Sequence, residues 1–167
     1  ANTMCCLTEA LGMSLPGSAL IPASYAARLR SSFESGRTIV ELCKKGISAR
    51  KILTKEAIRN AVKVTMAICG STNAVLHLPA IANEAELDIN VLEEFEKLSK
   101  ITPQIAKVNP AAKPDMEAFF RAGGIPRVMQ NLGGLLDTSV MTVTGKTLQE
   151  NLDAYVYEYP EDSSIIK

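Results

Sequence analysis

The stretch Cys69-Gly-Ser-Thr-Asn-Ala-Val-Leu-His-Leu-Pro79 carries the clearest structural signal in this sequence of 167 residues, because it marks the start of a helix. Gly70 interrupts the apolar run before it, and the short polar side chains of Ser71, Thr72 and Asn73 can accept hydrogen bonds from free backbone N–H groups. The residues after Asn73 are apolar enough to be buried. The stretch therefore predicts a capped, buried helix. A helix start with three polar side chains also suits an oxyanion of a small substrate, so a ligand site is the alternative to simple capping.

The rest of the sequence predicts a chain built mainly of helices. It contains residues suited to capping, apolar residues three or four positions apart, and glycines where helices can end. We expect about seven. The longest should run from an N-cap at Ser24 to Gly46, with an apolar stripe at Leu29, Phe33, Gly36, Val40 and Cys43. Further helix starts are expected where a residue suited to N-capping precedes an amphipathic segment, at Thr54, Asn90, Asp115 and Thr147.

Two short segments have the composition of strands. Residues 103–108 include Ile105, Ala106 and Val108 between two prolines, and residues 141–144 are also rich in β-formers. Hydrophobic residues make up 47% of the chain but aromatic residues only 5%, which favours helix packing over a β-sandwich. The expected fold of this segment is therefore helix-dominated with one or two short strands around one core.

Charge and cysteine usage narrow the classes of partner. The 18 basic and 18 acidic residues balance, and no apolar run is long enough to span a bilayer, so neither nucleic acid nor a membrane is an expected partner. The four cysteines form no C-x-x-C pair, which suits free thiols in a reducing cytoplasm and does not favour metal binding by this chain alone. His77, the single histidine, has no assignable partner, so a hydrogen-bonded core residue is expected in preference to a catalyst.

Four strings, in one order along the chain, carry a family resemblance. They are residues 1–17 (ANTMCCLTEALGMSLPG), 70–78 (GSTNAVLHL), 121–126 (RAGGIP) and 142–148 (TVTGKTL). Together they resemble the family of dihydroxy-acid dehydratases, 6-phosphogluconate dehydratase and related sugar-acid dehydratases. The match covers nearly the whole chain.

The resemblance implies a hydro-lyase that removes water from a 2,3-dihydroxy acid to give a 2-keto acid. Members of the family use an iron–sulfur cluster as a Lewis acid, and Mg²⁺ holds the substrate carboxylate. Their cluster ligands lie in Cys-Asp-Lys and Gly-Ala-Cys-Gly-Gly strings upstream of the segment matching Ala1, and the catalytic serine and a magnesium-binding glutamate lie in a C-terminal barrel. None of these strings is present here. We therefore expect no catalytic residue and no metal ligand in this segment, which should bind neither cofactor alone and be inactive alone.

The same resemblance implies a place in a larger protein. Residues 1–156 match the second half of an α/β parent domain, the N-terminal domain of the family, and residues 157–167 are expected to be a linker toward the barrel. The chain begins without methionine, which fits either a processed protein or a segment of a longer one, and the resemblance favours an internal segment. The full-length protein is expected to be a cytoplasmic homo-oligomer, a dimer, whose partner is a small dihydroxy acid. Ser71, Thr72 and Asn73 are its candidate substrate- or cluster-facing residues in this segment.

Departures from the family pattern and the choice of substrate complete the predictions. Cys69 and Glu86 stand where the family usually has glycine, so a positive φ at Cys69 would strain the backbone. The resemblance favours the enzyme of branched-chain (isoleucine and valine) amino-acid biosynthesis, with a sugar-acid dehydratase as the alternative. The residues alone leave open a third interpretation, a non-catalytic helical scaffold or binding domain.

Overall fold

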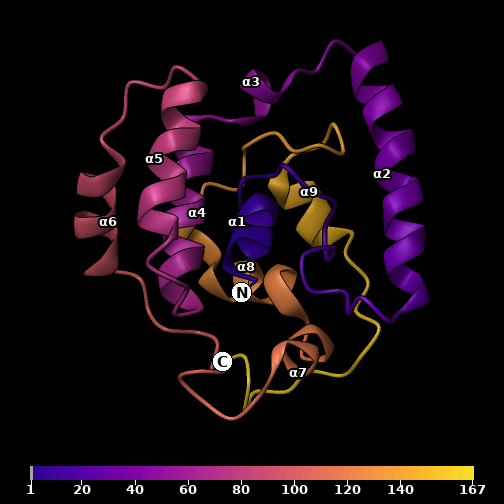
Figure 1. Cartoon of the computed structure of the whole chain (residues 1–167), viewed down its shortest axis with the longest axis vertical. Helices are drawn as coiled ribbons and strands as arrows, with labels where there is room; N and C mark the ends of the chain where they lie inside the picture. The colour runs from indigo at the N-terminus through magenta and orange to yellow at the C-terminus, as the bar shows by residue number, and fades with distance from the viewer. Residues whose placement is uncertain (1) are drawn as a thin grey trace.

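The computed structural model describes residues 2–167. Helix α4 (Lys55–Ala67) lies beside α1 and behind α5 in the view of Figure 1. The side chain of Thr54 caps α4 by accepting a hydrogen bond from the Ala57 N–H at 3.2 Å. Eight of the thirteen residues of α4 are buried. Four helices pack against it: α1 (Thr3–Ala10), α5 (Ala74–Glu84), α6 (Val91–Ser99) and α8 (Gly124–Leu132). The core is therefore a helical layer built around one buried helix.

Helices account for nearly all the regular structure of the described residues. The remaining elements are α2 (Ala26–Lys44), α3 (Ala49–Ile52), α7 (Met116–Arg121), the 3₁₀ turn η1 (Gly133–Leu135) and α9 (Leu148–Asp153). Residues 2–167 thus form nine α-helices where about seven were expected, because they also form short elements such as the four-residue α3. The predicted side-chain caps at Asn90, Asp115 and Thr147 are confirmed, as is the one at Thr54.

The prediction of one or two short strands is wrong for the described residues, which contain no sheet. The two segments form only isolated bridges, Ala106 with Ile166 and Met141 with Thr147. The N–H groups of Ile105 and Ala106 instead donate to the Ala67 carbonyl at 2.8 and 2.9 Å. That carbonyl lies in the last turn of α4, where carbonyl groups lack partners within the helix. The extended segment therefore bonds to the end of α4 and makes a single antiparallel bridge to Ile166, which is too short to form a sheet.

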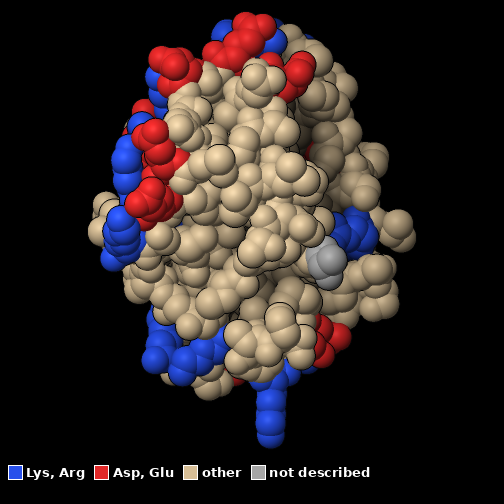
Figure 2. Space-filling model, turned by 60° about the vertical axis from the view of Figure 1, so that its left-hand side comes forward, with Lys and Arg blue, Asp and Glu red and all other residues tan. Residues whose placement is uncertain are grey.

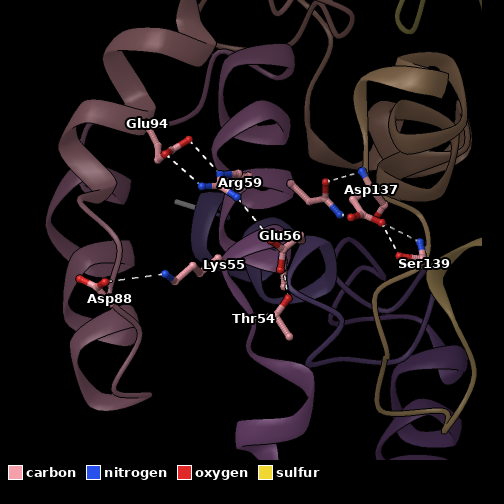
Figure 3. A network of polar contacts seen from close by, with 10 residues as sticks. Thr54, Lys55, Glu56, Arg59, Asp88, Glu94, Asp137 and Ser139 are labelled. Atoms are coloured by element: carbon pink, nitrogen blue, oxygen red, sulfur yellow. Dashed lines mark hydrogen bonds and ion pairs between the residues drawn. The ribbon is translucent and has the colours of Figure 1, made fainter.

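A network of polar contacts joins α4 to its surroundings (Figure 3). Arg59 pairs with Glu94 of α6 at 3.1 Å and with Glu56 of its own helix at 3.3 Å. The fully buried Asn60 donates to the Asp137 carbonyl at 2.8 Å and accepts from the Asp137 N–H at 3.0 Å. The amide side chain therefore ties α4 to the loop that precedes α9.

Helix α2 is the exception to this packing. It stands apart at one edge of the molecule, and no other helix of the described residues packs along it (Figure 1). Only Leu42 of its nineteen residues is buried. The amphipathic pattern correctly predicted a helix here, but its apolar stripe is not covered. The predicted cap at Ser24 is wrong too, because the N-cap is Tyr25 and it makes no side-chain capping bond.

Residues 157–167 pack against the helices, although their sequence has no period and suggested a linker. The Arg127 guanidinium lies over the ring of Tyr157, with its central carbon 3.7 Å from the ring centroid. The Tyr157 hydroxyl donates a hydrogen bond to the Gln130 side-chain oxygen at 2.7 Å. Ile166 is fully buried, and the Lys107 N–H donates to the Ile165 carbonyl at 2.8 Å. The segment thus completes the surface of the helical layer. A connection to a further domain stays a prediction.

Candidate functional site

The turn between α4 and α5 places the candidate residues. Cys69 ends α4 in the left-handed region, with φ +50°, and the Gly70 N–H donates to the Thr65 carbonyl at 2.8 Å. This is the hydrogen bond that closes a helix with a C-terminal turn of the Schellman type. A Cβ at Gly70 would lie 3.0 Å from a methyl carbon of Thr3 and 3.1 Å from one of Thr65. Glycine is therefore needed at position 70 for α1 and α4 to come this close.

Ser71, Thr72 and Asn73 lie together at the surface, at the start of α5. The Ser71 N–H donates to the Thr3 hydroxyl of α1 at 3.1 Å, and the Ser71 hydroxyl accepts from the Asn73 N–H at 3.2 Å. Asn73 is the N-cap of α5 but makes no side-chain capping bond. All three residues are exposed. The turn thus joins the starts of α1 and α5 and leaves the Asn73 side chain available to a ligand.

The segment that contains this turn carries no charged side chain. No Asp, Glu, Lys or Arg occurs between Thr65 and Asn83 in the sequence. Figure 2 shows a broad uncharged face, bordered by acidic and basic side chains, on the side of the molecule where α5 lies. Only Ala74, Leu78 and Ala82 of α5 are buried, so the expectation of a buried helix holds for one face alone. His77 is exposed, and its prediction as a core residue is wrong.

Glu9 of α1 was not among the residues predicted to be functional, and its carboxylate is buried. Its two oxygens accept hydrogen bonds from the Gly17 N–H at 2.6 Å and the Ala19 N–H at 3.0 Å. Burial raises the pKa of Glu9 to about 7, although the two N–H donors favour the charged form and lower it. A signal was available, since Glu9 is the only charged residue before Arg28. Its contacts give it a structural role, which is to hold the loop after α1.

Metal ligands do not come together in the described part of the chain. Among residues 2–167, no three His, Cys, Asp or Glu side chains are grouped in a way that could hold a metal ion. Burial raises the pKa of the Cys6 thiol to about 12, which opposes the thiolate form that a metal needs. Cys5, Cys43 and Cys69 are exposed on separate elements. These residues therefore do not fit an iron–sulfur cluster or a magnesium site.

The string of residues 142–148 forms a closed polar turn rather than a binding loop. The Asn151 amide donates to the Thr142 hydroxyl at 2.7 Å and accepts from the Thr144 hydroxyl at 2.9 Å. Thr147 and Glu150 then cap α9 reciprocally. The Thr142 and Thr144 hydroxyl groups also bond to each other, so the polar side chains of these two residues hold the turn closed. No helix in the described residues is long and apolar enough to cross a membrane.

Comparison with known proteins agrees with the four strings. The family model described as "Dihydroxy-acid/6-phosphogluconate dehydratase N-terminal" matches residues 1–151. The chain belongs to this family. Its curated relatives include proteins named dihydroxy-acid dehydratase from Nitratidesulfovibrio vulgaris (strain Miyazaki F), 51% identical over 91% of the chain, and from Methanococcoides burtonii, 46% identical over 98% of the chain. A third, from Caldicellulosiruptor bescii, is 49% identical over 95% of the chain.

The matches cover only part of each relative. The aligned regions amount to 28%, 30% and 29% of those three proteins. The chain therefore spans less than a third of the length of the curated relatives it matches.

Proposed function

We propose that this chain is part of a dihydroxy-acid dehydratase, a hydro-lyase that converts a 2,3-dihydroxy acid to a 2-keto acid in branched-chain amino-acid biosynthesis. The identity of about half of all aligned residues to proteins of that name, over nine-tenths or more of the chain, carries the proposal. The full-length protein would be a cytoplasmic dimer whose α/β N-terminal domain includes residues 1–156. A sugar-acid dehydratase is the second candidate, because the matching family model also covers 6-phosphogluconate dehydratases.

The iron–sulfur cluster and Mg²⁺ would be bound by parts of the full-length protein outside this chain. The poor fit of the described cysteines and carboxylates to either group supports this proposal. The contribution of the present residues would be to shape a neutral surface at the start of α5. There the Asn73 side chain, free of capping, can donate a hydrogen bond to an oxygen of the substrate.

The substrate is tested with the full-length protein, reconstituted anaerobically with iron, sulfide and Mg²⁺. We expect it to dehydrate 2,3-dihydroxyisovalerate with a higher kcat/KM than 6-phosphogluconate or gluconate. Turnover of a sugar acid alone would establish the second candidate. Turnover of neither would favour the helical scaffold. Residues 1–167 alone should be inactive, and any dehydration by them would show that the chemistry does not depend on the rest of the protein.

The role of the α5 start is tested with two asparagines of the same helix. Asn73→Ala should lower kcat/KM about tenfold, the effect of losing one hydrogen bond of about 1.4 kcal/mol. Asn83→Ala, at the exposed far end of α5, is the matched control and should leave kcat/KM unchanged. Equal effects of the two substitutions would leave Asn73 with no role at the substrate.

A further inference from the structure

Helix α2 carries an apolar stripe that nothing in the described part of the chain covers. The side chains of Leu29 and Phe33 are 76% and 69% exposed, and Ile39 and Val40 are also open to solvent. The helix is held mainly at its two ends. Tyr25 at the start donates a hydrogen bond to Glu117 at 2.8 Å, and Leu42 near the end is buried. The stripe between them is therefore a preformed surface, not a disordered one.

Two features of this surface favour the docking of another polypeptide segment. It borders a groove of about 690 Å³ whose far wall is formed by Val143 and Thr144. In the middle of the stripe, nothing lies within 4 Å of the position that a Cβ of Gly36 would occupy. A missing side chain at the centre of a helix face lets a second backbone approach closely. Exposed apolar faces of this kind mark interaction sites in soluble proteins.

Charge disfavours a second copy of the chain as the occupant. Arg30, Arg37 and Lys44 follow one another at intervals of seven, so they line one edge of the stripe. Antiparallel pairing about a twofold axis brings the same edge of both helices together and would place two basic rows side by side. Arg37 and Lys44 pair with Glu34 and Glu41 of their own helix, at 3.2 and 2.8 Å, which weakens this repulsion and also means that neither cation needs a partner from outside the helix. An uncharged segment could therefore dock without supplying counter-charges.

The length of the relatives points to the remainder of the same polypeptide. A protein of their size has more than twice as many residues outside the matched region as inside it. A covalently connected segment also docks at a high effective concentration. We propose that the Leu29–Val40 stripe of α2 is the docking surface for an apolar segment of the full-length protein that lies outside residues 1–167. The proposal rests on the proposed function only in taking the full-length protein to be as long as its relatives.

The occupant is identified by photo-cross-linking in the full-length protein. A benzophenone amino acid replaces Phe33, and the same probe at Leu92, an exposed residue of α6, is the matched control. We expect Phe33 to cross-link to a peptide outside residues 1–167, and Leu92 to give no such product. Mixing ¹⁴N- and ¹⁵N-labelled protein separates links within one polypeptide from links between two. Isotopically mixed cross-links, or links from Phe33 only to residues 1–167, would overturn the proposal.

Hydrogen exchange provides a second measurement that needs no substitution. Amides of residues 29–43 should exchange at least about tenfold more slowly in the full-length protein than in residues 1–167, because docking suppresses local opening of the helix. Equal exchange in both proteins would contradict the proposal. Protection that appears in residues 1–167 as their concentration rises would assign the stripe to a second copy. None of these readings depends on activity, so they stand apart from the test of the proposed function.

Discussion

Helices α4 and α2 have similar amphipathic patterns in the sequence, but the fold buries most of α4 and leaves most of α2 exposed. Eight of thirteen residues are buried in α4, which α1, α5, α6 and α8 surround, whereas α2 buries one residue of nineteen. Periodicity states that a helix has an apolar face, but not which element covers that face. Most of the buried contacts of these two helices therefore belong to α4, and the exposed face of α2 is the surface for which we propose a docking partner.

The largest expected effect separates two isoleucines. Ile58→Ala in α4 should lower the free energy of unfolding of residues 1–167 by about 2–5 kcal/mol, because the fully buried side chain leaves a cavity. Ile39→Ala in α2 should change it by less than about 0.5 kcal/mol, because that side chain is exposed. Urea denaturation measures both. Similar losses would show that α2 is packed in solution and would break the comparison.

A second prediction concerns the buried Glu9 of α1, one of the helices that pack on α4. Its contribution to the free energy of unfolding should depend on pH. Its pKa is about 7 in the folded chain against an ordinary value of 4.5, so the folded state binds a proton that the unfolded state has released. The contribution of Glu9 to stability should therefore be largest below about pH 4.5 and fall, by roughly 3 kcal/mol in total, as the pH rises through about 7.

The test compares the wild type with Glu9→Gln. Subtracting the stability of the variant from that of the wild type at each pH isolates the contribution of Glu9 from those of the exposed carboxylates. The difference should decline between about pH 4.5 and 7 and then level off. A difference that stays constant across this range would mean that Glu9 keeps its ordinary pKa in the fold.

The two helix starts should also differ. Thr54→Ala removes the hydroxyl that caps α4 and should cost about 1 kcal/mol. Ser24→Ala precedes α2, where no side-chain capping bond exists, and should cost less than about 0.5 kcal/mol. Thermal melts of the two variants are sufficient. An equal cost at Ser24 would indicate a cap that forms in solution.

The smallest expected effect lies at the helix ends, both of which use a residue with positive φ. Gly46, with φ +63°, follows the C-cap of α2, and Cys69, with φ +50°, follows the C-cap of α4. Cys69→Gly should stabilise the chain by about 0.5–1 kcal/mol, because glycine has no Cβ to clash in this conformation. Gly46→Ala should destabilise the chain by about 1 kcal/mol, because alanine is strained at positive φ. No neighbour lies within 4 Å of its Cβ position, so this strain is the only expected cost. Loss of stability in Cys69→Gly would contradict this account.

Several features of the candidate site were accessible from the sequence, and others were not. The start of α5 at residues 71–73 was predicted, and the two positions where glycine was expected, Cys69 and Glu86, are the two non-glycine residues with positive φ among those described. The exposure of His77 and the burial of Glu9 were not foreseen, because both depend on the neighbours that a helix face meets. The apolar character of α5 was read as burial, yet one of its faces is the uncharged surface shown in Figure 2.

Helix boundaries followed from residues close together in the chain. Thr54, Asn90, Asp115 and Thr147 bond to N–H groups three residues away, so local composition was enough to place these starts. Burial required the tertiary structure. The extended segment at Ile105 pairs with the end of α4 because that end lies beside it in space, and the Asn60 amide meets Asp137 across 77 positions of sequence. Which apolar faces are covered, and that the face of α2 is not, is decided by such long-range contacts, since an apolar face is stabilised only by whatever packs on it.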